Sequence, residues 1–360
     1  MIHSSKPTFA VLALSAACLT GALTQPAFAL GGEKTAKILA PVAFDPQADH
    51  AGEGGSLFWV NQPDGAKGVK KVIMPFFQVQ FVTASQVGAT GAGGAHAKMA
   101  MRLKGPTPAQ MQAITDEVYQ SFVTDLKTAG LEVVSPEEAK TYSAYSEIMA
   151  AAKPSGEIVK GMNSVTSAFY APTGMNFYYL PTMLPDLAGG GSMTAIGNAS
   201  IVRKEADLMS QSGAAVIGFR AVVDFATLSA SDRRGLRAFA RNAKTKGEAG
   251  LLIRPVATQV FLITPNAKAT MIDPQSRMRL ELQSPLMIDS EAITDMADNQ
   301  TSGQKTGQAI GNAISLLGGV GMSKTKSYDI VVDPDVWQAD VTGALKGVSA
   351  AAVARIKAGL

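Results

Sequence analysis

Hydrophobic and polar positions follow two different periods between residues 69 and 134. Residues 77–81 alternate between apolar and glutamine side chains, which is typical of a half-buried strand. From residue 107 to residue 129 apolar residues recur at three- and four-residue spacing. This spacing predicts one apolar stripe on a helix, formed by Met111, Ile114, Val118, Phe122 and Leu126. Residues 131–134 then predict a second strand.

Capping residues mark the ends of this predicted helix. Thr107 is in the N-cap position, Pro108 suits the first helical position, and Gln110 completes a capping box. Gly130 suits the left-handed residue that ends a helix, and Ser135 begins a second capping box directly afterwards. The order strand, helix, strand, helix predicts a layered α/β domain.

We expect the apolar stripe to pack on a sheet that includes the strands near 72–82, 131–134 and 214–225. The opposite face of the helix carries polar side chains that we expect to stay in water: Gln112, Asp116, Gln120 and Lys127. Residues 88–94 are rich in Gly and Ala, and we interpret them as a loop between the first strand and the helix.

The second half of the chain continues with alternating helical and strand patterns. We predict a helix at 203–211, a basic helix at 231–246, and strands at 214–225, 256–264 and 277–283. In the last of these strands Met278, Leu280 and Leu282 should face the core, and Arg277, Arg279, Glu281 and Gln283 should face water. A turn signal at Asp273-Pro274 predicts that 268–272 and 277–283 pair as an antiparallel hairpin, so the sheet should be mixed.

The C-terminal residues predict a helix at 304–317 and a strand at 327–332. Asp333 should cap a helix that runs to Leu345, and Ser349 should cap a last one.

Together these patterns predict an α/β protein with a mixed sheet, helices packed on it, a long irregular insertion and a small α-rich C-terminal segment. The predicted parts are a signal peptide at 1–29, an N-terminal extension at 30–68, an α/β domain at 69–300 with the irregular insertion at about 150–200, and a C-terminal helix–strand–helix segment at 301–360.

The first 29 residues have the pattern of a bacterial signal peptide. Lys6 precedes an apolar run at 8–17, and Ala27-Phe28-Ala29 is a small-x-small cleavage pattern. The run is too short to span a bilayer, so we expect export to the periplasm or the medium. Cys18 is the only cysteine and follows Ser15-Ala16-Ala17, which is close to a lipoprotein signal; acylation there would place the protein at the outer membrane.

Composition narrows the function further. The 360-residue chain is 46% hydrophobic and has a net charge of +3, which suits a protein with a substantial core and no strong electrostatic field. Export disfavours nucleic acid as a partner. His50 and His96 lie in glycine-rich surroundings without HxH or HExxH spacing, so we expect no metal site and no cofactor.

Two groups of residues are candidates for binding. Arg234, Arg237 and Arg241 share one face of the predicted basic helix and could meet an anionic lipid surface or a glycan, although a solvated helix has the same pattern. Phe177, Tyr178 and Tyr179 lie in the aromatic part of the insertion and could line a site for an apolar ligand or a partner.

Two short motifs are shared with penicillin-recognising serine enzymes, namely S-x-x-K at 323–326 and KTG at 305–307. Their order is reversed and no S-x-N lies between them, so we do not predict such an enzyme. A hydrolase with an unrecognised site stays an alternative.

Four segments resemble a group of bacterial envelope domains. Ile73-Met74-Pro75-Phe76 is similar to the end of the first strand in this group, and 130–134 is similar to its G-x-x-V-V strand. Residues 213–218 are close to its G-A-x-x-V-x-G strand, and 273–276 match its turn except for the glycine. The group comprises the curli-secretion subunit, the N-terminal domain of the TolB translocation protein and lipoprotein activators of penicillin-binding proteins.

The resemblance implies an exported envelope domain that works by contact, without a catalytic centre. We therefore expect an assembly or interaction role, with an envelope protein, a glycan or an anionic lipid surface as partner. A periplasmic carrier of an apolar ligand, bound beneath the Met/aromatic insertion at 175–183, is the alternative.

Overall fold

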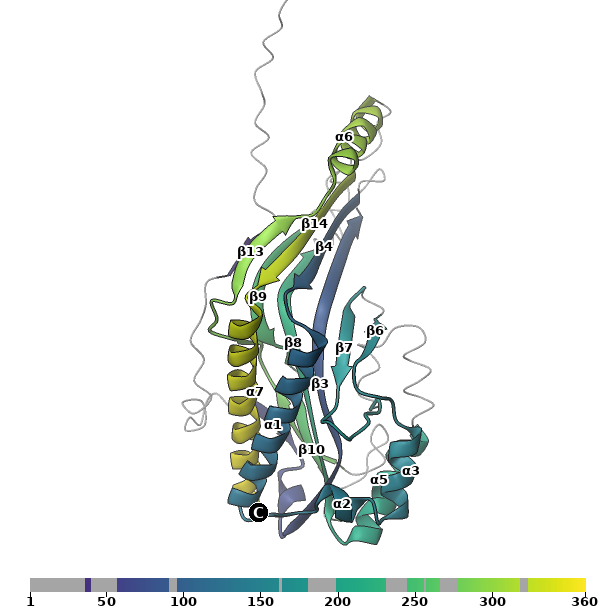
Figure 1. Cartoon of the computed structure of the whole chain (residues 1–360), viewed down its shortest axis with the longest axis vertical. Coiled ribbons are helices and arrows are strands. Elements are labelled where there is room, and N and C mark those ends of the chain that lie inside the picture. The colour runs from purple at the N-terminus through teal and green to yellow at the C-terminus, as the bar shows by residue number, and fades with distance from the viewer. Residues whose placement is uncertain are drawn as a thin grey trace, which may run out of the picture. The chain divides into compact units, whose positions relative to one another are not determined.

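The fold is built on two long neighbouring strands, β3 (Lys71–Thr90) and β8 (Ala215–Ala230), which run through the sheet (Figure 1). They pair in parallel from Val72 to Phe81. The computed structural model describes residues 36–39, 57–90, 96–161, 164–180, 199–230, 245–255, 257–265, 277–317 and 323–360, which all belong to one structural unit, Thr35–Leu360.

The described strands form one mixed sheet, and helices pack on it. The strands are β1 (Ala36–Ile38), β2 (Phe58–Asn61), β3, β4 (His96–Lys104), β5 (Glu132–Val133), β6 (Glu157–Lys160), β7 (Thr166–Tyr170), β8, β9 (Thr245–Ile253), β10 (Gln259–Ile263), β11 (Arg277–Leu282), β12 (Leu286–Met287), β13 (Ile293–Asp298) and β14 (Ser323–Val332). The helices are α1 (Pro108–Thr128), α2 (Pro136–Ala139), α3 (Ser143–Ala151), α5 (Ala199–Ser212), α6 (Ser302–Leu317) and α7 (Pro334–Lys357). The main path runs β13-β14-β4-β3-β8-β10-β11-β2. The mixed α/β fold predicted from the sequence is confirmed.

Strict alternation gives β8 two buried faces. Its odd-numbered side chains from Ala215 to Phe225 join the larger core cluster, as the sequence predicts, while Val216 joins a second cluster on the other side of the sheet. Phe219 lies beside Phe77 of β3, with the two rings stacked 4.7 Å apart. The two strands therefore carry the centre of the core.

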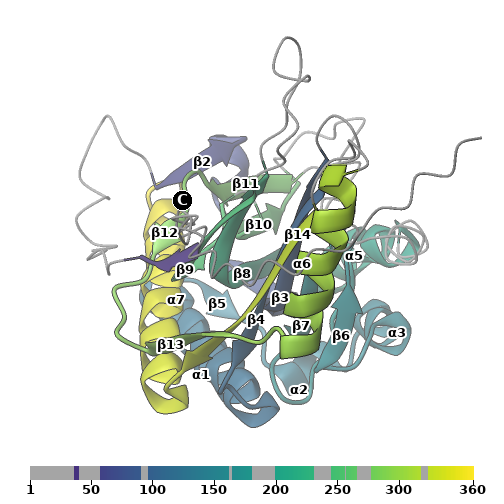
Figure 2. The ribbon, with the colours of Figure 1, turned by 90° about the horizontal axis from the view of Figure 1, so that it is seen from above.

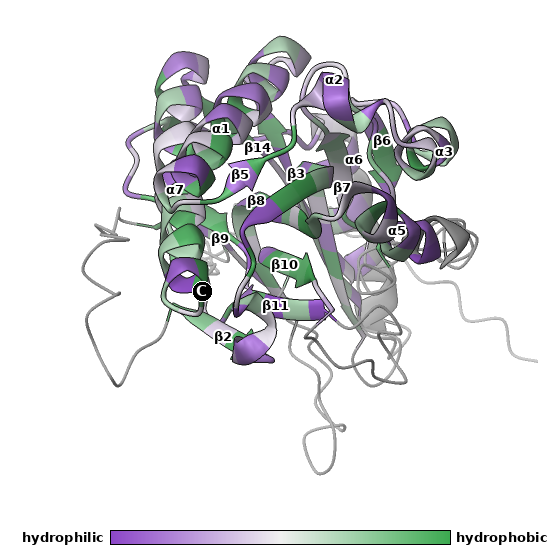
Figure 3. Cartoon of the chain, turned by 90° about the horizontal axis from the view of Figure 1, so that it is seen from below, coloured by the Kyte–Doolittle hydropathy of each residue, from purple (hydrophilic) through white to green (hydrophobic). Residues whose placement is uncertain are grey.

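Helix α1 packs on this face of the sheet beside α7. Thr107 and Gln110 form the predicted capping box, and the predicted apolar stripe from Met111 to Leu126 is buried. The ring of Phe122 lies 5.4 Å from that of Phe219. Figure 3 shows hydrophobic and hydrophilic residues around both helices, as expected of helices with one buried side.

The opposite side of α1 is only partly in water, which corrects the prediction. Gln112 donates to the carbonyl oxygen of Ala171 at 2.8 Å, and Asp116 accepts from the backbone N–H and the hydroxyl of Thr173 at 2.6 and 2.7 Å. Gln120 is exposed. The polar side chains near the start of α1 thus hold the segment that follows β7.

Helix α7 is continuous, whereas the sequence predicted two helices. The Asp333 carboxylate caps it by accepting from the N–H groups of Asp335 and Val336 at 3.0 and 3.1 Å. Ser349 lies inside the helix, and its hydroxyl donates to the carbonyl oxygen of Lys346 at 2.9 Å. A serine can be accommodated within a helix by bonding backward in this way, so it did not mark a new N-terminus.

The other face of the sheet is covered by α3, α5 and an aromatic segment at 171–180. Phe76 and Phe261 point to this side and contact each other at 5.8 Å between ring centres. The insertion predicted to be irregular is regular at its start, because β6 and β7 form an antiparallel hairpin and β7 pairs with β3. Residues 181–198 lie outside the described residues.

The end of β3 replaces part of the loop predicted at 88–94, and strand β4, which the sequence analysis did not predict, follows before α1. β3 continues through Gly88 to Thr90 and pairs antiparallel with β4. Ala97, Met99 and Met101 of β4 are buried and Lys98, Ala100 and Arg102 alternate with them, which is a strand pattern. Residues 91–95 lie outside the described residues.

The C-terminal segment belongs to the same sheet. β14 lies between β13 and β4, parallel to β4 and antiparallel to β13. At the other end of the main path β2 pairs with β11, and β1 pairs in parallel with β9, which lies off that path. The N-terminal and C-terminal parts of the described chain therefore both contribute strands.

The partners of β11 differ from the predicted hairpin. β11 pairs antiparallel with β10 on one side and with β2 on the other. The turn at 273–276 and the segment 268–272 lie outside the described residues. Met278, Leu280 and Leu282 are buried as predicted, but Arg277 is buried too, at 5% exposure.

Candidate functional site

A polar pocket lies between α6 and the strands β3, β4 and β14; we refer to it as the α6 pocket. Its volume is about 760 Å³. Figure 2 shows α6 beside β14 and β4. The pocket is the candidate site because it gathers polar and charged side chains from distant parts of the sequence.

The floor of the α6 pocket is one face of three paired strands. Ala100 of β4 pairs with Gln86 of β3 and Ser327 of β14, so these three side chains lie in one row. Lys98 and Arg102 lie on either side of Ala100 along β4 and point to the same face. The small Ala100 leaves the centre of the floor open between two cations.

The other face of β4 explains why this floor is fixed. Met99 and Met101 are buried there, and a Cβ added at Gly247 of β9 would lie 2.5 Å from atoms of both side chains. This close packing fixes the pairing register of β4. A shift of the register by one residue would turn Lys98 and Arg102 into the core.

Amide side chains of α6 form the wall opposite the floor. Gln304, Gln308 and Asn312 are spaced four residues apart and share one side of the helix. Gln308 donates to the carbonyl oxygen of Ser323 at 3.1 Å, and Asn312 accepts from the Ser323 N–H at 2.7 Å. These bonds satisfy backbone groups at the start of β14, a part of the strand that does not pair with β13.

The start of α6 is fixed by its own polar contacts. Thr301 and Gln304 form a reciprocal capping box with bonds of 3.0 and 3.2 Å. Lys305 forms an ion pair with Asp298 at 3.0 Å. Partial burial of Asp298 opposes ionisation, but bonds from the Gln300 N–H and Lys305 outweigh it and lower the pKa of this carboxyl. A charged carboxylate thus anchors the helix beside the pocket.

The electrostatic balance of the pocket is positive. Lys98, Arg102 and Lys326 line it, and Asp329 is the one carboxylate among its described lining residues. Asp329 accepts from the Asn299 amide at 2.7 Å. Within the described part of the chain, neither Lys98 nor Arg102 forms an ion pair or side-chain hydrogen bond. Both cations are therefore available to an anionic group.

The candidate binding residues predicted from the sequence are not among the described lining residues of the α6 pocket. Arg234, Arg237 and Arg241 lie outside the described residues. The last residues of the predicted basic helix are not helical, because Thr245 and Lys246 begin β9 and pair with β8. Whether the three arginines form a binding face stays a prediction.

The predicted aromatic site lies in the core. Phe177 and Tyr178 are fully buried and Tyr179 is 2% exposed. Phe177 stacks on Phe169 at 5.6 Å, and Tyr178 contacts the edge of Phe76 at 5.0 Å. The three rings fill space against neighbouring rings, and none of them lines the α6 pocket.

A buried polar cluster joins this aromatic segment to the sheet. The hydroxyl of Tyr178 donates to Glu205 of α5, which also pairs with Arg277 of β11. The Arg277 guanidinium lies 4.5 Å from the centre of the Phe261 ring. Burial and the neighbouring Glu205 charge raise the pKa of Tyr178 well above its usual value, so this hydroxyl stays protonated as a donor. The cluster explains why Arg277 is buried, against the alternation of its strand.

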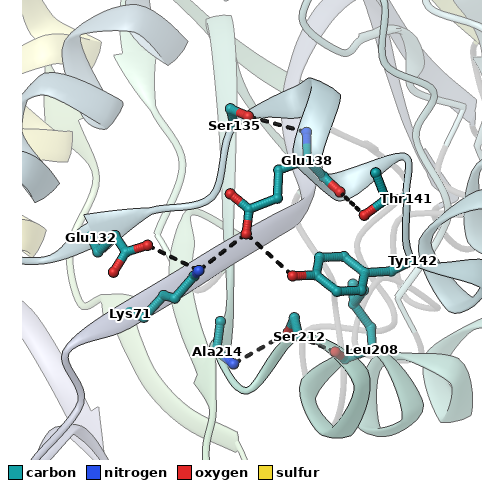
Figure 4. A network of polar contacts seen from close by, with 9 residues as sticks. All are labelled: Lys71, Glu132, Ser135, Glu138, Thr141, Tyr142, Leu208, Ser212 and Ala214. Atoms are coloured by element: carbon teal, nitrogen blue, oxygen red, sulfur yellow. Dashed lines mark hydrogen bonds and ion pairs between the residues drawn. The ribbon is translucent and has the colours of Figure 1, made fainter.

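A second polar network fixes the start of β3 (Figure 4). The Lys71 ammonium lies 2.9 Å from Glu132 and 3.1 Å from Glu138, and Tyr142 donates to Glu138 at 3.2 Å. The hydrogen bonds that the Lys71 ammonium donates to both carboxylates raise the pKa of Lys71, and the same contact lowers the pKa of Glu138. The side chain of Ser135 caps α2 in the same network, which thus joins three elements.

The serine-enzyme motifs do not form a catalytic arrangement. Ser323 and Lys326 both line the α6 pocket, but they lie on strand β14, where side chains three residues apart leave the strand in opposite directions. The serine-enzyme motif requires the two side chains on one side. Lys305-Thr306-Gly307 lies on α6. His96 begins β4 and is exposed, with its Nδ1 3.4 Å from the Thr90 hydroxyl; His50 lies outside the described residues. Within the described ranges, no group of three or more His, Cys, Asp or Glu is placed to hold a metal.

Comparison with known proteins finds no match among protein-family models, curated proteins or solved structures. The resemblance to envelope domains therefore depends on the sequence patterns alone. No helix in the described ranges is both long enough and apolar enough to cross a bilayer.

Proposed function

We propose that this protein is exported to the bacterial cell envelope and acts there by binding a negatively charged, polar envelope component in the α6 pocket. Export is inferred from the signal-peptide pattern at 1–29. The observation that carries the binding proposal is that Lys98 and Arg102, on either side of Ala100 in an amide-lined pocket, form no ion pair with any residue that the structure describes.

The lining of the pocket favours a polar ligand. A volume of about 760 Å³ lies within the range of small-molecule sites, but those sites are mostly lined by apolar and aromatic side chains. Here Ala100 is the one apolar residue among the described lining residues. A ligand with charges and hydroxyl groups finds partners for both among these side chains.

The same lining favours binding over catalysis. Ser323, Thr325 and Ser327 supply hydroxyl groups, yet no histidine is among the described lining residues to activate them. Asp329 is the one carboxylate of the lining, so the described pocket does not contain the paired carboxyl groups used in glycoside hydrolysis.

The test is co-sedimentation of the purified full chain with isolated bacterial envelope fragments. The double variant Lys98→Gln/Arg102→Gln should bind at least about tenfold more weakly, since a hydrogen bond to a charged group contributes about 1.5–3 kcal/mol and 1.4 kcal/mol is a factor of ten. A matched control, Lys127→Gln/Lys357→Gln, removes two exposed charges from α1 and α7 and should bind as the unaltered protein does. Equal binding by the first variant and the control would refute the pocket as the site.

A further inference from the structure

We infer that the ligand of the α6 pocket is a linear acidic oligosaccharide that lies along β4 and places anionic groups on both Lys98 and Arg102. This inference rests on the proposed function, because it names the ligand of the same pocket.

The spacing of the two cations sets the length of the ligand. Lys98 and Arg102 are four residues apart on one strand and share one face, so their Cα atoms are about 13 Å apart at about 3.3 Å per residue. A single small anion would contact both cations only if both side chains leaned over Ala100 toward each other. An extended chain with negative charges on separate units can contact both without such leaning, and each added contact then becomes intramolecular.

The walls between the cations suit sugar hydroxyl groups. Gln86 and Ser327 on the floor, with Gln304 and Gln308 on α6, each offer hydrogen-bond donors and acceptors. A sugar hydroxyl is also both donor and acceptor, so it can be satisfied by such side chains in several orientations.

The strand edges disfavour an extended peptide. A peptide that adds to a sheet needs an open backbone edge. β4 is paired on both sides, by β3 and β14. The edge of β14 beside α6 is occupied by Gln300, Gln308 and Asn312, which bond to the backbone of Thr325 and Ser323. The described pocket therefore offers no backbone ladder to a peptide.

Nucleic acid and lipid fit less well than a glycan. Single-stranded nucleic acid is held by aromatic side chains that stack on its bases, and the described lining contains no aromatic residue. Acyl chains need apolar area, and Ala100 is the one apolar residue of the described lining. The remaining ligand with repeated negative charge and many hydroxyl groups is an acidic glycan.

The experiment measures affinity of the full chain for galacturonic acid and its di-, tri- and tetrasaccharides by titration calorimetry. Affinity should rise at least about tenfold between the monosaccharide and the length that spans both cations, and then level off. Lys98→Gln and Arg102→Gln should each abolish this gain and leave the weak binding of the monosaccharide to the remaining cation. Ala100→Phe keeps both charges and fills the centre of the floor, so it should weaken the tetrasaccharide at least about tenfold.

Four results would overturn the inference: affinity independent of length, equally tight binding of neutral maltotetraose, equally tight binding of hexaglutamate, or tight binding of phosphate alone. These results are distinct from failure of the proposed function. If acidic glycans do not bind but the double variant still loses the envelope, the function stands and the glycan is wrong. If the double variant keeps its envelope binding, the pocket itself is wrong.

Discussion

Replacing Phe122 by alanine tests the packing of α1 on the sheet. Phe122 is fully buried in the middle of the helix, and its ring lies 6.0 Å from Phe77 and 5.4 Å from Phe219. Loss of the ring leaves a cavity between the helix and both long strands. Phe→Ala changes of this kind cost about 3–5 kcal/mol, a large share of the roughly 5–15 kcal/mol by which domains are stable.

Urea denaturation followed by circular dichroism measures this cost. With a slope of about 3 kcal/mol/M, the midpoint should fall by roughly 1–2 M. Phe122→Leu should lose about 1–2 kcal/mol, because leucine fills most of the volume but loses the ring contacts. Gln120→Ala on the exposed side should change stability by less than about 0.5 kcal/mol. Equal losses in Phe122→Ala and Gln120→Ala would show that the helix does not pack in this register.

Three further changes test other parts of the fold by the same denaturation assay. Gly218→Ala should lower the free energy of unfolding by about 1–3 kcal/mol, because the new methyl group would lie 2.2 Å from a phenylalanine ring of β10. The control Gly303→Ala, whose methyl group would have nothing within 4 Å, should leave stability unchanged or raise it by up to about 1 kcal/mol. Asp333→Ala should lower the free energy of unfolding by about 1 kcal/mol, because it removes the N-cap of α7. Asp333→Asn should keep most of the capping stabilisation, since asparagine is also a good N-cap. Equal stability of the two variants would contradict the capping role. Lys71 lowers the pKa of Glu138, so this carboxylate stabilises the fold above the ordinary glutamate pKa of about 4.3 and loses its effect as pH falls through its lower folded value. Glu138→Gln should therefore be less stable than the unaltered protein at pH 7, with the difference shrinking below about pH 4; a constant difference would contradict the pairing.

Local signals in the sequence predicted the central part of the fold. The capping box of α1, its apolar stripe and the alternation of β8 are each determined by neighbours within a few residues, and each is found in the structure. Residues 96–104, which form β4, also alternate in the sequence, although no strand was predicted there. A count of alternating positions from Ala97 to Leu103 would have identified the strand.

Other features depend on distant parts of the chain and have no local signal. The buried position of Arg277 follows from Glu205 and Phe261, which reach it from α5 and β10. The floor of the α6 pocket exists because Gln86, Ala100 and Ser327 are in register on three strands. A sequence shows the charges of Lys98 and Arg102 but not the pairing that places them on the floor of one pocket.

A crystal structure of the full chain with bound tetragalacturonate would test the central claim most directly. We expect sugar density between β4 and α6, with one carboxylate on Lys98, another on Arg102 and hydroxyl groups bonded to Gln304 and Gln308. Density for the glycan at another surface, with the α6 pocket filled only by water, would contradict it.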